Sequence, residues 1–516
     1  MVEKRTTGNN VDRFIWKALL PGVLVVIMIS ISLTIIGCQE PPVIMVGVGE
    51  TVVTPPDPVG VSLSGFDRGG NTSTGVHDDL YARSVIVEGE EGSAVALMTI
   101  AIINLNEEMA DIIREQVEQQ TGIPFENIVI SATHTHSGPS APRSEDPDSE
   151  YNRFFIEQSV QSAVQAWVNR VPGRIGIGTT QVYGVGKKRD ALLQGGVHPD
   201  RETAVIKVET AAGRLMGVFF NYGAHPATLD LHNLEITEDW PYFAIRDIRQ
   251  EVGEDVVVGY FQGAEGDINT GYSALHSAVG ANMYGARSFE QAEWKGRIMG
   301  NSVLEVLHEI ETTGDRIVQA AYGHFDFPRR TTYPWTVEEA REWEQQAREK
   351  LGEMEQRLAG NYPMNREEAR QWQAQAREMA ARGELDVRNQ IGPRVLDSYR
   401  VDLWAAEQVV HMAEVIEALP EDPDPIRMPM QAIRLGETVF VTFPNEVYSE
   451  IGLAVKEQSP FEETVILGLA GGRGGYIPTA ADHLERGYVP NGTPFAPQAE
   501  QVLIDASLEL IGRISD

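Results

Sequence analysis

The sequence is poor in cysteine, and this limits how the fold can be stabilised. Cys38 is the only cysteine among 516 residues. One cysteine cannot form a disulfide within the chain, so the stability of the fold has to come from a hydrophobic core. The chain length and the 42% hydrophobic content are sufficient for a large core.

Positive charge is also scarce. The chain has 42 Lys and Arg residues against 75 Asp and Glu residues, which gives a formal net charge of −33 at pH 7. Such a surface is repelled by the phosphates of nucleic acids and by anionic membrane surfaces. We therefore expect no nucleic-acid partner.

Long hydrophobic runs are absent except at residues 18–37. This run follows a basic N-terminal region and ends in "TIIGCQE", with Ile35 three residues before Cys38 and Gly37 directly before it. The pattern resembles a bacterial lipobox, in which the cysteine is lipidated and becomes the mature N-terminus. An uncleaved anchor is the alternative, because twenty apolar residues are long enough to cross a bilayer.

We therefore predict a lipoprotein signal peptide at residues 1–37, a tether at 38–45 and a catalytic domain at 46–516. The basic residues before the apolar run favour a cytoplasmic N-terminus, so the body lies outside the cytoplasm. The expected location is the bacterial cell envelope, with the protein held on the membrane by lipid on Cys38.

The pattern between residues 60 and 330 alternates apolar runs with amphipathic segments, which favours an α/β or mixed α+β domain with a large mixed sheet flanked by helices. Helices are predicted at 107–122 and 150–171. The predicted strands are 84–89, 94–103, 174–180, 204–209, 215–223 and 255–261.

The segment 335–419 differs from the rest, since it is rich in Glu, Gln, Arg and Ala. Thr336 with Glu339, and Asn365 with Glu368, fit capping boxes that open helices. A third helix follows from about Leu396. We predict a helical insertion that is largely solvated, after which strands return at 429–443 and 463–472.

Histidine is sparse, with eleven in the chain, yet two of them stand in "NIVISATHTHSGPS" one residue apart. In extended geometry His134 and His136 point to the same side of the strand. A polar strand end that happens to carry two histidines is the simpler alternative. The rest of the chain has to decide between these interpretations.

Polar groups follow five apolar runs, where ligands gather in open α/β sheets. Two histidines, a carboxylate and a further oxygen donor are the ligands of a catalytic zinc site with one open position. These strand ends therefore predict a metal site. The groups are His134 with His136, His225 in "AHPATL", the loop "QGAEGDINTGY", Glu446 in "PNEVY" and Tyr476 in "RGGYIP".

From about Val46 to Pro490 the sequence resembles the neutral/alkaline (non-lysosomal) ceramidases. The stretches that carry the resemblance include "VVTPPDPVGVSLSGF", "ATHTHSGPS", "GDINTGY", "FPNEVYSEIG" and "YIPTAADHLERGY". The resemblance implies one zinc ion, bound by His134, His225, Glu446 and Tyr476. It also implies that His136 acts beside the metal, that Tyr488 contacts substrate and that Arg189 is the active-site arginine.

The chain departs from this family at the nucleophile. The family has a serine where "GDINTG" places Asn269, and asparagine cannot form the same alkoxide, although its amide can donate to an oxyanion. We also expect the chain, which ends at Asp516, to lack the family's C-terminal immunoglobulin-like domain. The insertion at 335–419 is a third difference.

These departures favour a zinc hydrolase of amide or ester bonds that differs from a true ceramidase. Zinc-bound water would attack directly, His136 or Asp267 would handle protons, and Arg189 or Asn269 would stabilise the oxyanion. The alternative is a non-catalytic zinc lipoprotein that binds a lipid, glycan or peptide. Retention of His136 and Arg189 favours the enzyme, whereas loss of the serine favours the binder.

The first prediction concerns Cys38. Substitution Cys38→Ser should release the protein from membranes or block its processing, because no other thiol can carry the lipid. Membrane fractionation and mass spectrometry of the mature N-terminus measure this. A mature protein that retains residues 1–37 would contradict the prediction.

Overall fold

The computed structural model describes residues 44–66, 68–140, 149–189, 198–270, 274–279, 287–315, 317–358, 393–472, 475–484 and 488–515. The chain divides into two units, 1–40 and 41–516. The predicted signal peptide, with Cys38, lies outside the described residues, and so does the tether up to residue 43. Within the described part, no helix has the length and apolar character needed to cross a bilayer.

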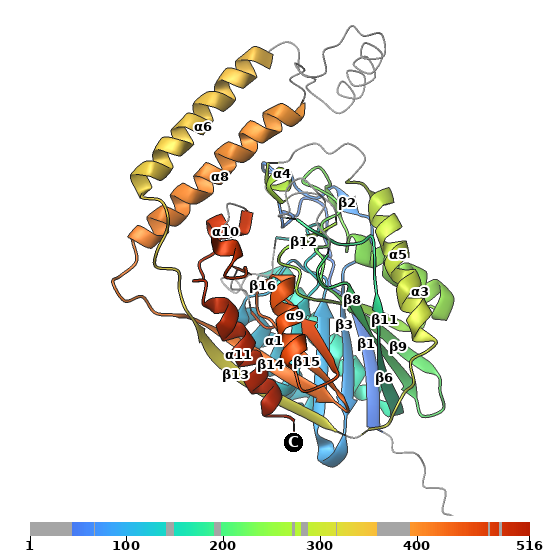
Figure 1. Ribbon diagram of the computed structural model, residues 1–516. Helices are drawn as coiled ribbons and strands as arrows, with labels where there is room; N and C mark the ends of the chain where they lie inside the picture. The colour runs from blue at the N-terminus through green and yellow to red at the C-terminus, as the bar shows by residue number, and fades with distance from the viewer. Residues whose placement is uncertain are drawn as a thin grey trace, which may run out of the picture. The chain divides into compact units, whose positions relative to one another are not determined.

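An eight-stranded mixed sheet forms the centre of the second unit (Figure 1). Its order is β11-β9-β8-β6-β1-β3-β4-β5. The pairs β4–β5 and β9–β11 are parallel and the other pairs are antiparallel. The strands are β1 (Ile44–Val52), β3 (Tyr81–Glu88), β4 (Ala94–Ile100), β5 (Ile128–Ala132), β6 (Val171–Gln181), β8 (Glu202–Thr210), β9 (Leu215–Tyr222) and β11 (Val257–Gln262).

A second sheet packs on the inner face of the first, with strand order β13-β14-β15-β17. Phe219 and Phe261 of the large sheet share a core with Ile433 and Phe440 of the small one. The strands are β13 (Val318–Phe327), β14 (Ile426–Leu435), β15 (Thr438–Thr442) and β17 (Glu463–Leu467). The sequence-based prediction of a mixed α/β fold with a large mixed sheet is thus confirmed.

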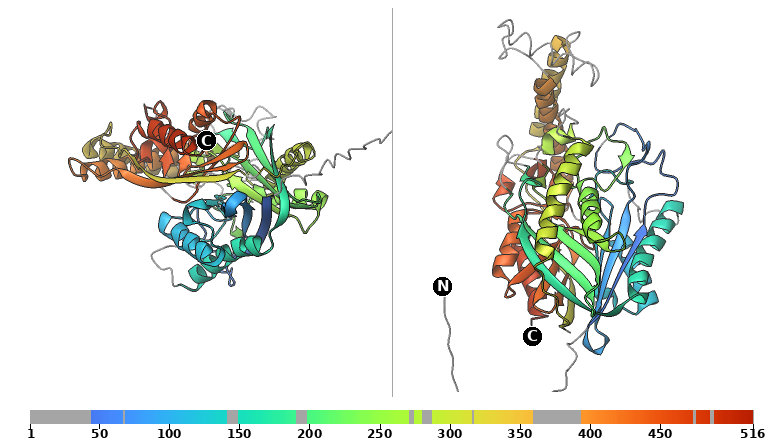
Figure 2. Two further views of the ribbon diagram at one scale, coloured as in Figure 1. Left: turned by 90° about the horizontal axis from the view of Figure 1, so that it is seen from below. Right: turned by 90° about the vertical axis from the view of Figure 1, so that its right-hand side faces the viewer.

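Helices cover the outer faces of both sheets (Figures 1 and 2). The pair α1 and α2 packs near β1, β3 and β4, the pair α3 and α5 packs over β8, β9 and β11, and α9 and α11 pack on the small sheet. Their bounds are α1 (Glu107–Thr121), α2 (Glu150–Val168), α3 (Trp240–Val252), α5 (Phe289–Leu307), α9 (Ser449–Gln458) and α11 (Ala499–Gly512).

Short elements complete the part of the chain that the structure describes. Three two-stranded pairs are β10–β2, β12–β7 and β16–β18. The bounds are β2 (Gly75–Val76), β7 (Lys187–Lys188), β10 (Glu235–Ile236), β12 (Ile268–Asn269), β16 (Glu446–Val447), β18 (Tyr476–Ile477), α4 (Ala274–Ala278), α10 (Tyr488–Gly492), and the 3-10 turns η1 (Glu90–Gly92), η2 (Phe125–Asn127) and η3 (Asp482–Leu484).

The large sheet is bent so strongly that its two edge strands, β5 and β11, contact each other. Thr99 Oγ1 donates to Tyr260 O at 2.5 Å, which ties β4 to β11. Gln262, fully buried at the end of β11, makes the central connection. Its amide nitrogen donates to Thr133 O at 3.2 Å and to Ala224 O at 3.3 Å.

The amide oxygen of Gln262 accepts three further hydrogen bonds. They come from Ala224 N at 3.2 Å, Gly263 N at 3.1 Å and the Tyr260 hydroxyl at 2.6 Å. One side chain therefore joins the carboxyl ends of β5, β9 and β11. These ends are brought together although β5 and β11 stand at opposite ends of the strand order.

A helical hairpin stands between β13 and β14 in the chain. It consists of α6 (Val337–Leu358) and α8 (Pro393–Glu417). The predicted capping box is present, since Glu339 N donates to Thr336 Oγ1 at 3.2 Å and Thr336 N donates to Glu339 Oε2 at 2.9 Å. The second predicted box, Asn365 with Glu368, lies outside the described residues.

Most side chains of α6 are exposed, as the sequence predicts, but the two helices also share apolar contacts. Ala340 of α6 is buried against Val409 and Ala413 of α8 in a small apolar core. The helix α8 also packs against α4 and α10. The small apolar residues thus hold the two helices together, while α4 and α10 attach α8 to the rest of the unit.

Substitution Gln262→Met should destabilise the protein by about 3 kcal/mol or more, since each buried backbone group left without a partner costs about 1–3 kcal/mol. The measurement is the shift in the midpoint of chemical unfolding. Gln119→Met, on the exposed end of α1, is the control and should leave the midpoint unchanged. Equal midpoints for both variants would show that the network around Gln262 does not stabilise the bend.

Candidate metal centre

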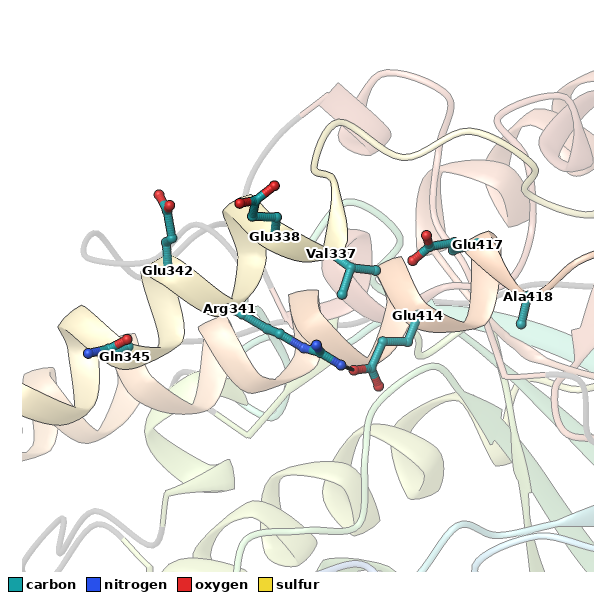
Figure 3. Close-up of a pocket in the computed structure, with 8 residues that line it drawn as sticks. All are labelled: Val337, Glu338, Arg341, Glu342, Gln345, Glu414, Glu417 and Ala418. Atoms are coloured by element: carbon teal, nitrogen blue, oxygen red, sulfur yellow. Dashed lines mark hydrogen bonds and ion pairs between the residues drawn. The ribbon is translucent and has the colours of Figure 1, made fainter.

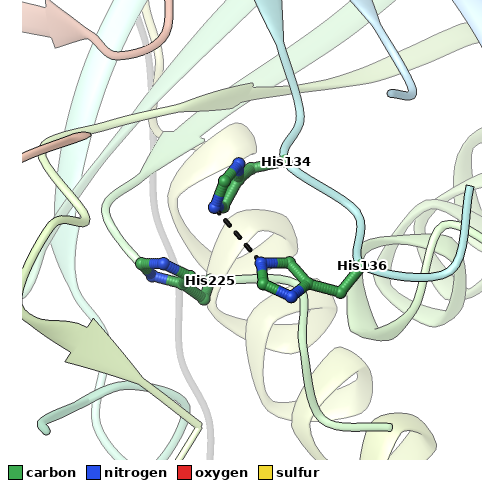
Figure 4. A group of neighbouring side chains, drawn as sticks. All are labelled: His134, His136 and His225. Carbon is green, nitrogen blue, oxygen red and sulfur yellow. Dashed lines mark hydrogen bonds between the residues drawn. The ribbon is translucent and has the colours of Figure 1, made fainter. Parts of the chain in front are cut away.

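His134, His225 and Glu446 meet at the carboxyl ends of three strands. His134 follows β5, His225 follows β9 and Glu446 follows β15. The Oε2 atom of Glu446 lies 3.3 Å from His134 Nε2 and 3.2 Å from His225 Nε2. Both histidines are buried, with exposed fractions of 2% and 1%. Figure 4 shows the two rings with that of His136 beside them.

The hydrogen bonds on the far side of the rings fix which nitrogen can bind a metal. His134 Nδ1 lies 2.6 Å from Ile103 O, and His225 Nδ1 lies 2.9 Å from Ile268 O. A carbonyl oxygen only accepts, so each Nδ1 carries the proton and each Nε2 presents a lone pair. Backbone carbonyls of this kind orient metal-bound histidines in general.

The cluster therefore brings together atoms that repel one another unless a cation lies between them. Each of two Nε2 atoms lies within 3.3 Å of one carboxylate oxygen, and His136 Nε2 lies 3.3 Å from His134 Nε2. This donor set fits zinc, which prefers histidine nitrogen and carboxylate oxygen.

The backbone at His134 differs from the extended geometry that the sequence suggests. Its φ angle is +72°, in the left-handed region, after β5 has ended at Ala132. His134 N still donates to Ile102 O at 2.9 Å, which holds the turn. The two histidines do come together, with ring centroids 4.8 Å apart, but the turn rather than strand alternation brings them there.

His136 is positioned by a loop from the start of the chain. The Phe66 ring packs against its imidazole with a centroid distance of 4.8 Å. Arg68 Nη2 donates to His136 O at 2.8 Å. A Cβ atom at Gly65, which has a φ of +88°, would come within 2.5 Å of the imidazole. Burial lowers the pKa of His136 well below its ordinary value, so the ring is neutral at neutral pH.

Glu265 is a candidate donor that the sequence analysis missed. It lies just after β11 and is fully buried, and neither carboxylate oxygen has a hydrogen-bond partner within the described part of the chain. Its carboxylate is within 4.8 Å of donor atoms of His134 and Glu446. Burial, together with the charge of Glu446, raises the pKa of Glu265 well above its usual value.

A buried carboxylate without a hydrogen bond is costly unless it is protonated or faces a cation. Glu265 therefore fits as an additional oxygen donor to the same metal. The signal was present in the sequence, because Glu265 stands in the strand-end loop "QGAEGDINTGY" that supplied two other candidates.

The two predicted tyrosines stand beside Arg189. Tyr476 donates a hydrogen bond to Glu446, and burial raises the pKa of its hydroxyl well above the usual value. Arg189 Cζ lies 4.9 Å from the ring centroid of Tyr476 and 5.2 Å from that of Tyr488. Arg189 Nη1 lies 3.0 Å from His225 Nε2. The structure thus brings Arg189, Tyr476 and Tyr488 to the cluster.

Asp267 and Asn269 lie deeper in the same region. The Asp267 carboxylate accepts from Ser449 N at 2.8 Å and from Ser449 Oγ at 3.1 Å. Burial raises its pKa to about 7. These contacts give Asp267 the role of holding the start of α9. Asn269 is 3% exposed on β12, next to Ile268, whose carbonyl orients His225.

A separate hollow lies on the hairpin rather than at this cluster (Figure 3). It is lined by residues of α6 and α8 and by Ala418. Several of these residues are charged, including Arg341 and Glu414, which form an ion pair at 2.7 Å. None of the predicted site residues lines it. Its mixed charges lack the convergent buried donors of the histidine cluster.

Comparisons with known proteins identify relatives of the chain. The family model described as neutral/alkaline non-lysosomal ceramidase, N-terminal, matches residues 44–332. The neutral ceramidase of Drosophila pseudoobscura pseudoobscura is 22% identical over 309 residues, which cover 54% of this chain and 43% of that protein. The neutral ceramidase of Drosophila melanogaster is 24% identical over 234 residues, covering 42% and 33%. The chain thus spans less than half the length of these relatives.

Two solved structures share the fold. The crystal structure of neutral ceramidase from Pseudomonas aeruginosa has a TM-score of 0.65 at 17% identity, covering 92% of this chain and 75% of that one. A structure titled "Ceramidase complexed with C2" has a TM-score of 0.65 at 14% identity, covering 92% and 76%. At these identities the likeness establishes the fold alone.

Zinc affinity, measured by competition with a chelator, should identify the donors. His134→Ala and His225→Ala should bind zinc at least 100-fold more weakly than the wild type. Glu265→Gln should weaken binding by on the order of 10–100-fold, as changes beside a metal typically do.

The matched control is Glu238→Gln, another fully buried carboxyl group with a raised pKa. Glu238 pairs with Arg83 at 2.8 Å instead of facing the histidines, so this change should leave zinc affinity unaltered. Wild-type affinity in Glu265→Gln would remove Glu265 from the donor set. Wild-type affinity in both histidine variants would refute the whole set.

Proposed function

The chain belongs to the neutral/alkaline non-lysosomal ceramidase family, and we propose that it is a zinc-dependent hydrolase that cleaves the amide bond of N-acylated substrates. The main support is the convergence of His134 Nε2, His225 Nε2 and Glu446 Oε2 on one buried point. A bound cation explains why two imidazole nitrogens and a carboxylate oxygen lie so close together. The partly exposed side chains of Tyr476 and Tyr488 mark the side from which substrate reaches them.

His134, His225 and Glu446 would hold the metal, with Tyr476 or Glu265 as a further donor. When bound there, zinc supplies a Lewis acid that polarises a carbonyl and makes water nucleophilic near neutral pH. The charge of Arg189, buried against His225, favours the negative charge that develops on the substrate oxygen.

In the proposed reaction, His136 transfers the proton. Its ring is neutral at neutral pH, and Nδ1 has no hydrogen-bond partner within the described residues. A neutral imidazole can accept a proton from water and return it to the leaving amine. Asp267 is less suited to this task because Ser449 engages both of its carboxylate oxygens.

The position of Asn269 determines the type of mechanism. Asparagine offers an amide in place of the family's serine hydroxyl, so it can donate to an oxyanion but cannot form an acyl-enzyme. Water therefore attacks the carbonyl carbon directly in the proposed reaction. Water that attacks an amide carbonyl in this way can also attack an ester carbonyl, so ester bonds of similar shape are candidate substrates.

The proposed hydrolase acts outside the cytoplasm, held on a membrane by lipid on Cys38. The support for this location comes from the basic N-terminal region, the apolar run at 18–37 and the cysteine directly after Gly37. A membrane-tethered enzyme would be close to amphiphilic substrates. Loss of the serine at position 269 also supports a second candidate, a zinc lipoprotein that binds such a molecule without cleaving it.

Hydrolysis of N-acyl amides and esters tests the proposal. Activity should disappear with a chelator and return with zinc, and serine-directed covalent inhibitors should leave it unchanged. Asn269→Ala should lower the rate by about 10²–10³-fold, the value of one oxyanion hydrogen bond. His136→Ala should lower it by a similar or larger factor while zinc stays bound.

The control is His324→Ala, because His324 lies on β13 and contacts Glu107 at 2.8 Å, away from the cluster. It should retain full activity. Substrate binding without turnover in the zinc-loaded protein would favour the binding lipoprotein. An acyl group trapped on Thr270 or another side chain of that loop would refute direct attack by water.

A further inference from the structure

The hairpin reaches the candidate metal centre through one tryptophan. Trp404 of α8 stacks on Tyr488 of α10, with ring centroids 5.1 Å apart and an angle of 4° between the planes. Tyr488 in turn lies against Tyr476, with ring centroids at 5.9 Å, and below Arg189. Arg189 contacts His225. The insertion is thus three contacts away from a candidate zinc ligand.

Trp404 does not belong to the core that holds the hairpin together. Asp402, Ala406, Val409 and Ala413 recur at spacings of three and four, so they lie on one face of α8. That face meets α6, since Trp343 Nε1 donates to Asp402 Oδ1 at 3.2 Å and Ala340 packs with Val409 and Ala413. Trp404 stands two residues, about 200°, away from this face.

The two stacked rings lie beside a buried cation, Arg189. Trp404 and Tyr488 are both partly exposed, whereas Arg189 is 5% exposed. The outer side of the hairpin is different in character, because ion pairs such as Arg341–Glu414 cover it (Figure 3). The outer face of the hairpin is thus charged, whereas Trp404 faces Tyr488 on the side of the candidate metal centre.

We propose that Trp404 is a specificity-determining residue, which together with Tyr488 binds the hydrocarbon chain of the acyl group next to the scissile bond. This inference rests on the proposed amide hydrolase, since it places the acyl carbonyl near Arg189 and the chain along the rings. The faces and edges of the two aromatic rings are apolar, so an extended methylene chain can be buried against them.

The test is binding of saturated carboxylates of increasing length, from butyrate through octanoate to dodecanoate, to the zinc-loaded full chain. Calorimetry gives each affinity without any need for turnover. Each methylene buried against the rings should strengthen binding by about fourfold. Trp404→Ala should reduce the preference for dodecanoate over butyrate roughly tenfold, and Trp404→Phe, which keeps a ring, should restore most of it.

The matched control is Trp343→Ala in the same hairpin. It removes the stack with Trp335 and the hydrogen bond to Asp402, and it keeps the ring of Trp404 that stacks on Tyr488. Its chain-length preference should equal that of the wild type. An equal loss in Trp343→Ala and Trp404→Ala would overturn the inference, because it would show a general effect of loosening the hairpin.

The inference and the proposed function fail in different ways. A wild type with no chain-length preference, or a Trp404→Ala variant with the full preference, overturns the role of Trp404 whether or not amides are hydrolysed. Chain-length-dependent binding that needs Trp404, in a protein that hydrolyses no acyl amide or ester, supports the inference and removes the proposed activity.

Discussion

The buried side chain of Gln262 is the contact on which the candidate site depends. It joins Thr133, Ala224 and Gly263 by hydrogen bonds of 3.1–3.3 Å. Each of these residues precedes a polar side chain of the cluster by one or two positions, so one amide sets the relative positions of donors from three strands. Without the bend that brings β5 against β11, the histidines would stand at distant parts of an open sheet. The metal chemistry is therefore a property of the sheet's curvature as much as of its side chains.

Sequence patterns predicted most of what is local. The helices at 107–122 and 150–171 correspond to α1 and α2, and the apolar runs correspond to strands, because periodicity and burial act over short stretches. Polar residues directly after apolar strands identified His134, His225 and Glu446, which the structure brings within 3.3 Å of a shared carboxylate oxygen. That rule works because strand ends leave the core together and point their loops into one region.

The contacts between distant segments could not be predicted from the sequence. Strand order is not visible in a single chain, so nothing indicated that β11 would close on β5 and bring Glu265 beside His134. Among three polar residues of one loop, only packing shows that Asp267 holds a helix start while Glu265 faces the donors. The hairpin was predicted as a solvated insertion because its composition is polar, and one tryptophan, between Leu403 and Ala405, carries no signal of where it packs.

The place of the hairpin in the chain has an evolutionary consequence. It stands between β13 and β14, which pair over ten residues from Val318↔Leu435 to Phe327↔Ile426. That pairing does not depend on what joins the strands, and lengthening a connection costs little free energy. The connection can therefore gain, lose or exchange helices without moving any candidate metal donor. Selection can therefore change substrate preference through this connection while the candidate metal donors stay fixed. New preferences can arise by insertion and deletion in the hairpin rather than by mutation of the candidate metal centre.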